Sequence, residues 1–379
     1  MKYFSQSKLD VQSNFFLYSI YIASFVSFFI INKTFYFNIF FESLLILIFL
    51  FNFNGKTIKK IVTSFFLLNI AYLSISFLYS VSYNGDNVKD FLLIYKTFIY
   101  LIILPFIIDY KILSLKSFLV FFKFIVSLFL AKYIISKLFF DQHRPIVFAE
   151  NNFELMFLAL LLYLYFIVKG KVEFVYQFAI AVIYLLSASI SGILILIFVL
   201  SVINYRLIKK KSVYVLVALI ILTLLAVIVL KERTNGSLDL TTNTRYEFLL
   251  IFFNETRDWN VIDFLFGSGR ITALSEYACY SQYYWTSGLF SYNNNGQCYS
   301  VILHSYLLRV IFDHGILGFL FIILFTIKII INAGYKYKDA LVIIGIAIIN
   351  GLSVSAFNSI YFITGIVFYL ILKRRICSL

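Results

Sequence analysis

The feature that most constrains the fold is a series of long apolar runs that recurs through most of the chain. A helix needs about 20 mostly apolar residues to cross the hydrocarbon core of a bilayer. The runs are continuous rather than alternating, so each of them predicts a membrane-spanning helix. Twelve runs are present, at residues 15–31, 35–52, 61–81, 91–108, 117–138, 153–168, 172–188, 190–205, 213–230, 311–331, 340–355 and 357–372.

The composition excludes a soluble protein. Hydrophobic residues make up 62% of the 379 positions, charged residues make up 13%, and only 2 residues are proline. So few charges cannot cover the surface of the two or three soluble domains that a chain of this length would otherwise form. The chain is therefore predicted to be an all-α polytopic membrane protein in contact with the lipid bilayer.

The positions of Lys and Arg predict the orientation of this bundle. If the N-terminus is inside, the short outer loops hold only Lys33, Lys89 and Arg144, whereas the inner loops and both termini are rich in Lys and Arg. This asymmetry is the positive-inside pattern, and an even number of spans then leaves both termini in the cytoplasm. It also accounts for the net charge of +14, so a nucleic-acid partner is not expected.

A polar stretch at residues 231–302 interrupts the pattern of short connections. It lies on the predicted outer side and divides the chain into a region of nine spans at 1–230, the large loop itself, and a C-terminal region of three spans at 303–379. Loops of this length are usually functional. Amphipathic segments at 245–253 and 259–266 predict interfacial helices within the loop, and a mobile, poorly structured loop is the alternative.

The side chains available for chemistry point to a phosphate-bearing lipid substrate. His143, His304 and His314 are the only histidines, and none stands at metal-ligand spacing from a cysteine or carboxylate. Glycine-rich nucleotide-binding loops are also absent, so neither a metal nor a cofactor is expected. Arginine pairs with phosphate oxygens, and a histidine can accept a proton from a hydroxyl group. An outer-face group of these two residue types therefore suits such a substrate.

The spacing of His304, Gly315 and Gly318 is the sharpest local signal. On one continuous helix, residues 11 and 14 positions after His304 return to within about 20° and 40° of its direction. The three residues would then share a stripe on which the glycines admit a neighbouring helix. This predicts that His304 lies at the outer end of the stripe, near the membrane surface.

The segment that contains these residues resembles a known family. A histidine followed by Asn, Ser or Gln, then nine residues, Gly, two residues and Gly, Thr or Tyr is the motif of the O-antigen ligase and O-antigen polymerase (Wzy-like) superfamily. The chain matches it at His304, Ser305, Gly315 and Gly318. As in the family, the motif directly follows a large outer loop.

Two further segments are similar to the family and one departs from it. Residues 265–269 resemble its hydrophobic–Gly–x–Gly turn, and residues 144–152 resemble the arginine-to-asparagine stretch before the next span. The family often carries Ser-x-Ser-Arg at the outer end of a middle span, whereas here Ser189 is followed by Ile190. The missing arginine would then be replaced by another, such as Arg144 or Arg257.

The resemblance implies a membrane-embedded, metal-independent glycosyltransferase of the GT-C type in the bacterial inner membrane, with a periplasmic active site. Its donor and acceptor would be glycans linked to undecaprenyl pyrophosphate, and a chain-length regulator protein would be a further partner. A polymerase transfers the growing glycan onto another lipid-linked repeat unit. A ligase transfers it onto lipid A–core instead. We favour the polymerase, and the ligase remains open.

A lipid-linked oligosaccharide flippase is an alternative of a different class. Such transporters also have about twelve spans and carry charges inside their helices. Charged residues of this kind are Glu42, Lys96, Lys123, Lys132, Lys137 and Arg309. The simpler interpretation of each is a charge at the membrane interface or one paired across the bundle.

Specific roles follow for the outer residues. We expect His304 to act on the acceptor hydroxyl as a general base or hydrogen-bond acceptor, and Arg245 to bind the donor pyrophosphate. Arg144, Arg257 and Arg270 are further candidates for phosphate binding. A sugar-binding groove is expected along the loop, or alternatively a membrane-interface belt, formed by Tyr277, Tyr280, Tyr283, Tyr284, Trp285, Tyr292 and Tyr299.

The cysteines divide between two compartments. Cys377 follows a basic cluster on the predicted cytoplasmic side, whereas Cys279 and Cys298 both lie in the outer loop. Because the outer compartment permits disulfides, we expect a Cys279–Cys298 bond that holds the aromatic stretch as a compact lobe, and two free thiols are the alternative.

Overall fold

The computed structural model describes residues 2–30, 35–52, 60–108, 110, 112–205, 244–269, 271–293 and 295–373. Every structural statement below concerns these residues. The predicted run at 213–230 and the candidate Arg270 lie outside them.

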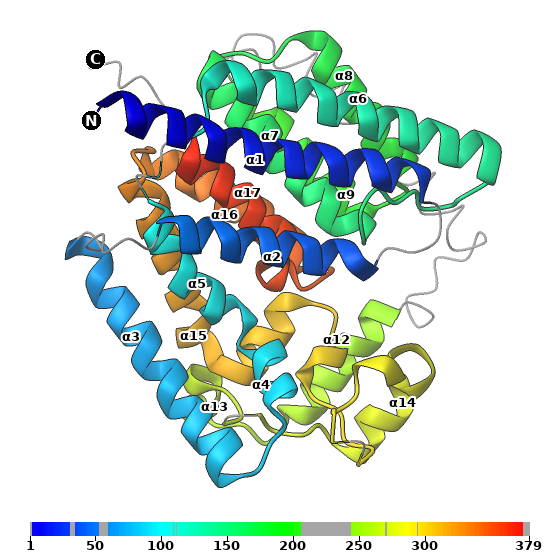
Figure 1. Cartoon of the computed structure of the whole chain (residues 1–379). Coiled ribbons are helices and arrows are strands. Elements are labelled where there is room, and N and C mark those ends of the chain that lie inside the picture. Colours follow the sequence, from blue (N-terminus) through cyan, green and yellow to red (C-terminus); the bar gives the residue numbers. More distant parts are fainter. Residues whose placement is uncertain are drawn as a thin grey trace.

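The described part of the chain is helical and contains no β-strand. Figure 1 shows the bundle, with the helices of the large loop at one end. In chain order the main helices are α1 (Lys2–Phe29), α2 (Phe35–Asn52), α3 (Lys60–Phe77), α4 (Val88–Ile94), α5 (Lys96–Ile107), α6 (Leu115–Phe140), α7 (Asn151–Lys169), α8 (Phe174–Leu186), α9 (Ile190–Ile203), α12 (Thr244–Glu255), α13 (Val261–Phe266), α14 (Glu276–Thr286), α15 (Tyr306–Asn332), α16 (Tyr337–Gly351) and α17 (Ile360–Ile371).

The helices are those of a membrane protein. Four of those described are long and apolar enough to cross a bilayer, and a fifth is added if α4 and α5, which meet at 67°, form one broken span. The four are Val62–Tyr83, Leu115–Phe140, Asn151–Lys169 and Tyr306–Asn332. Each predicted run within the described residues coincides with a helix, although several of these helices are shorter than a full span. Large apolar side chains such as Ile22, Leu67 and Val120 are exposed on the outer faces, as expected where lipid replaces water.

The run at 91–108 does not form the single straight helix that its hydropathy predicts. It breaks at Tyr95, where α4 ends and α5 begins. The first backbone N–H groups of α5 therefore lack partners within the helix, and the N–H of Thr97 donates to the side-chain oxygen of Asn358 at 3.2 Å. The Tyr95 ring stacks on Phe91 with centroids 4.4 Å apart, which fills the bend.

The last helix, α17, lies at the centre of the bundle. All of its residues from Ile360 to Ile371 are buried, and it packs against α7, α2 and α5. A Cβ atom at Gly365 would lie 2.5 Å from Leu160 Cδ1, so this glycine lets α17 and α7 approach closely.

Chain segments from both halves of the sequence meet at the end of the bundle that the charges predict to be cytoplasmic. The N–H of Leu113 donates to Ile371 at 3.0 Å, and the N–H of Lys373 donates to Leu113 at 2.8 Å. Tyr110, in the same connection between α5 and α6, donates its hydroxyl hydrogen to Gln12 of α1. The beginning of α1 and the end of α17 therefore lie at one end, as Figure 1 also shows.

Three of the charges within the helices, Glu42, Lys96 and Lys132, have partners inside the bundle. Lys96 pairs with Glu42, which also accepts a hydrogen bond from the Tyr100 hydroxyl at 3.1 Å. Lys132 donates to the carbonyl oxygens of Ser27, Phe28 and Ile30 at 2.7–3.2 Å. It thus satisfies acceptors that the end of α1 would otherwise leave unpaired.

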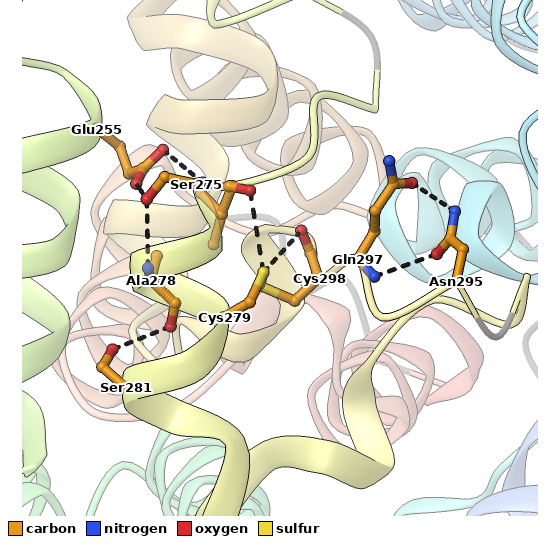
Figure 2. Close-up of a disulfide and its surroundings, with 9 residues drawn as sticks. Glu255, Ser275, Ala278, Cys279, Ser281, Asn295, Gln297 and Cys298 are labelled. Carbon is orange, nitrogen blue, oxygen red and sulfur yellow. Dashed lines mark hydrogen bonds between the residues drawn. A yellow bond between two sulfur atoms is a disulfide. The ribbon is translucent and has the colours of Figure 1, made fainter.

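The described part of the large loop has a small apolar core of its own. Side chains from α12, α14 and the segment before α15 form it, among them Phe248, Phe252, Ala278 and Ile302. Cys279 and Cys298 form a disulfide within this core, with Cα atoms 5.6 Å apart. Figure 2 shows Glu255 at the end of α12 reaching Ser275, whose hydroxyl caps the start of α14 beside the disulfide.

The first testable prediction concerns this disulfide. Thiol labelling of the denatured, unreduced protein should modify one of its three cysteines. The Cys298→Ser variant should then be less stable by about 3 kcal/mol, because a cross-link restricts a loop of this size in the unfolded chain. The midpoint of thermal unfolding in detergent measures that loss, and reaction of all three cysteines would contradict the bond.

The tip of the lobe is fastened to the start of α4. Asp90 is buried there and accepts hydrogen bonds from the Ser291 hydroxyl at 2.7 Å and the Tyr292 N–H at 3.2 Å. Lys89 lies 5.0 Å from the Tyr292 ring centroid, and Asn87 donates to Asn293 at 3.2 Å. The lobe is therefore held both by its disulfide and by the first region of the chain.

Candidate functional site

His304 lies just before α15 and not on it. The helix begins at Tyr306 with Ser305 as its N-cap residue, so the predicted helical stripe from His304 through the two glycines is wrong. The His304 side chain is exposed, and its ring centroid lies 5.2 Å from that of Phe248 on α12. This contact brings the histidine next to the first turn of α12, which carries Arg245.

Gly315 breaks α15 instead of continuing a stripe. Its φ of 68° and ψ of −179° lie in a region that is open essentially only to glycine. A Cβ atom at this position would lie 2.2 Å from the carbonyl oxygen of Leu265, in α13. The predicted close approach does occur, but the approaching element belongs to the large loop and is not a neighbouring membrane helix.

Gly267 supplies the other side of the same contact. Its φ is 88°, and a Cβ atom there would lie 2.8 Å from the backbone of Phe312, Asp313 and His314. The N–H of Ser268 donates to the Phe312 carbonyl oxygen at 2.8 Å. The turn after α13 and the kink in α15 therefore touch backbone to backbone. Gly318 does not take part, since its Cβ would meet only the His314 side chain of its own helix, at 2.5 Å.

Arg144 is held by the first turn of α7. Its guanidinium donates to the side-chain oxygen of Asn152 at 3.0 Å, and the same oxygen accepts a hydrogen bond from the Ser189 hydroxyl at 2.6 Å. Ser189 closes the Ser187–Ser189 turn that resembles the family's Ser-x-Ser segment. Arg144 thus lies next to this turn, whereas Arg257 lies beyond the end of α12.

The loop that carries Arg144 is fixed by a buried carboxylate. Glu154 accepts hydrogen bonds from three consecutive backbone N–H groups, those of residues 147–149, at 2.6–2.8 Å. Asn151 donates to the Pro145 carbonyl oxygen at 2.8 Å. Because these bonds leave the loop little freedom, the position of Arg144 is set before any ligand arrives.

Glu150 links Arg144 and Arg245 electrostatically. Its side chain is exposed, yet the surrounding protein removes part of its hydration and raises its pKa, while the charges of Arg144 and Arg245 act in the opposite direction.

The surroundings of His304 keep its ring neutral. Partial desolvation, followed by the positive charges of Arg245 and Arg309, lowers the pKa of His304 below its usual value. A histidine that is neutral at pH 7 can accept a proton. The structure thus places the His304 ring beside α12, next to the turn that carries Arg245.

Of the other predicted site residues, Arg257 lies away from Arg245. From Arg245, α12 continues for about 15 Å to its end at Glu255, and the exposed Arg257 lies beyond that end. Tyr284 and Trp285 belong to α14, but their side chains lie outside the described residues.

The remaining tyrosines of the predicted groove differ in exposure. Tyr277 and Tyr280 on α14 are 69% and 86% exposed, and so are accessible to a ligand or to the membrane surface. Tyr299 is buried in the core and therefore cannot line a surface groove. Tyr292 packs beneath Lys89, as described above, and the Tyr283 side chain lies outside the described residues.

Two groups of polar residues were not predicted as site residues. One is Glu150, whose only sequence signal is its place between Arg144 and the buried first turn of α7. The other is a buried cluster in α15, where Arg309 lies 3.9 Å from Asp313, and Asp313 accepts a hydrogen bond from Ser300 at 2.5 Å. His314 is also buried and lies 2.9 Å from the Tyr72 hydroxyl.

Comparison of the chain with protein-family models, with curated proteins and with solved structures gives no match.

Proposed function

We propose that the chain is a GT-C-like glycosyltransferase with about twelve spans that polymerises glycans linked to undecaprenyl pyrophosphate at the periplasmic face of the bacterial inner membrane. The observation that carries the proposal is the position of His304 against Phe248 of α12, next to the turn that carries Arg245, beside a loop fastened by a disulfide and by Asp90. The resemblance of the His304 segment to O-antigen polymerases supplies the reaction class.

The proposed reaction needs one base and a neutralised leaving group. The acceptor hydroxyl oxygen attacks the anomeric carbon of the donor glycan, and the bond from that carbon to the pyrophosphate oxygen breaks. Undecaprenyl pyrophosphate leaves with the bonding electrons, while His304 accepts the hydroxyl proton. Arg144 and Arg245 stabilise the charge that develops on the leaving pyrophosphate.

The pairing of the charges inside the helices argues against a transport pathway. Glu42 and Lys96 bind each other, and Lys132 binds the end of α1, so these residues have structural partners. A flippase would need cations that are available to a passing pyrophosphate. The ligase alternative has the same site chemistry and differs only in the acceptor.

Reconstitution tests the proposal directly. The purified protein in liposomes should form glycosidic bonds when it is given only an undecaprenyl-pyrophosphate-linked repeat unit, and gel analysis should show a ladder of products. Products that appear only when lipid A–core is added would identify a ligase. Movement of the lipid-linked glycan across the bilayer without bond formation would identify a flippase.

Arg245 provides the second testable prediction. The Arg245→Lys variant keeps the charge but loses the two-pronged contact to phosphate. Loss of such a contact costs about 1.5–3 kcal/mol, and kcat/KM should therefore fall about 10- to 150-fold. Arg257→Lys is the matched comparison, since Arg257 lies beyond the far end of the same helix. An equal loss in both variants would contradict the assignment of Arg245.

A further inference from the structure

His304 lies on a short segment that is anchored on both sides. Leu303 and Tyr306 are buried, whereas the His304 side chain between them is exposed. The Tyr306 hydroxyl oxygen lies 3.0 Å from the hydroxyl oxygen of Thr97, in α5. Because the histidine ring itself is exposed, its position depends on how the backbone of this segment is held.

A buried hydrogen bond holds the segment against α15. The Ser300 hydroxyl group donates to a carboxyl oxygen of Asp313 at 2.5 Å, and both side chains are buried. From Ser300 the chain passes through a 3₁₀-helix (Ser300–Ile302) and His304 into α15, so this bond closes a loop that contains His304. Hydrogen bonds to an ionised acceptor are short and strong. The bond therefore limits how far His304 can move relative to α15.

Arg309 supplies the positive charge that Asp313 needs inside the protein. Its Nε lies 3.9 Å from Asp313, and its Nη2 donates to the carbonyl oxygen of Leu93, near the end of α4, at 2.5 Å. Arg309 and Asp313 are both buried, and a buried carboxylate requires a pairing charge and hydrogen bonds. Asp313 has both, and it can therefore remain an acceptor for Ser300.

We propose that Asp313 is a positioning residue for glycan transfer, which fixes His304 beside the turn that carries Arg245 by holding Ser300. This inference rests on the proposed function, because it assumes that His304 acts on the acceptor hydroxyl. Because Asp313 is buried, it acts through the position of the histidine and not by contact with the substrate. Loss of its bond to Ser300 should slow the proton transfer and leave binding of the lipid-linked glycans unchanged.

The test compares Ser300→Ala with Ser27→Ala in the transfer assay in liposomes. Ser300→Ala removes the hydrogen bond and keeps the pair of Asp313 and Arg309. It should lower kcat about 10- to 100-fold, as expected for a misplaced catalytic group, and KM should stay within about twofold. Ser27 is the matched control, because it is buried in α1 and its hydroxyl donates to Ser24 of the same helix. Ser27→Ala should change neither constant.

Two further measurements distinguish positioning from a general structural role. In the His304→Ala background, Ser300→Ala should cause no further loss of rate, because the hydrogen bond acts through the missing histidine. Hydrogen–deuterium exchange of residues 299–305 should become faster in Ser300→Ala and should not change in Ser27→Ala. Losses that multiply in the double variant, or an unchanged exchange rate in Ser300→Ala, would overturn the role of Asp313.

The outcomes also separate this inference from the proposed function. Unaltered protein that forms no glycosidic bond would refute the proposed function itself. Normal transfer by the unaltered protein, with Ser300→Ala indistinguishable from Ser27→Ala, would refute only the role of Asp313. If Ser300→Ala does not elute as a single folded species, Asp313→Asn, whose amide oxygen is an uncharged and weaker acceptor, is measured and judged in the same way.

Discussion

Replacing His304 by alanine should lower kcat for glycan polymerisation by about 10²- to 10⁴-fold, the range over which a general base contributes to catalysis. The side chain is exposed and lies before the first turn of α15, so its removal should leave the helix bundle intact. Single-turnover rates in liposomes, at matched amounts of folded protein, measure the effect. His143→Ala is the comparison, because His143 is also exposed. A His304→Ala variant that still makes polymer of normal length and amount would refute the proposed role.

The pH profile gives a second measure of the same residue. The surroundings of His304 lower its pKa, so the ring is neutral at pH 7 and activity should be level there. Activity should fall only when the pH drops through this lowered pKa, where the ring gains a proton and can no longer act as a base. Because Arg245 contributes to the lowering, Arg245→Ala should move the acid limb of the residual activity to higher pH. An unmoved limb would mean that the limb belongs to another group.

Replacing Gly315 by alanine should destabilise the contact between α13 and α15 by about 4 kcal/mol, the combined cost of an unfavourable backbone conformation and of overpacking. The new Cβ would lie 2.2 Å from the Leu265 carbonyl oxygen, so α13 would have to move away. In the variant, hydrogen–deuterium exchange of residues 261–269 should become faster than in the unaltered protein. Exchange in the centre of the bundle should stay the same.

Two glycine variants separate the causes of this effect. Gly334 also has a positive φ, of 96°, but no atom lies within 4 Å of its Cβ position, so Gly334→Ala should show the backbone cost alone. Gly288 has open space around it and no positive φ, and Gly288→Ala should be neutral. If Gly315→Ala resembled Gly288→Ala, the close contact of α13 with α15 would be wrong.

Hydropathy predicts where the helices lie because each long helix in a bilayer must satisfy its backbone internally. It does not predict breaks such as those at Tyr95 and Gly315, because these depend on groups supplied by distant parts of the chain. The side chain of Asn358 accepts a hydrogen bond from the N–H of Thr97, and the backbone of Leu265 occupies the space beside Gly315. The spacing argument for His304 assumed one continuous helix, and it failed for the same reason.

The candidate site, like the fold, could be predicted from the sequence only in part. Arginine and histidine could be selected from the sequence because their chemistry suits a phosphate-bearing substrate. The position of His304 beside the turn that carries Arg245 could not, because it arises from the packing of His304 on Phe248. The pairing of Cys279 with Cys298 was accessible to sequence reasoning, since the remaining cysteine lies in the other predicted compartment.

The central position of α17 has a consequence for biosynthesis. This helix is made after α2, α5 and α7, and yet it is buried along its whole length against them. During insertion, α2, α5 and α7 must therefore remain in the bilayer with their inner faces covered only by lipid or by insertion factors. The bundle can close around its axis only after α17 has been inserted among these earlier helices.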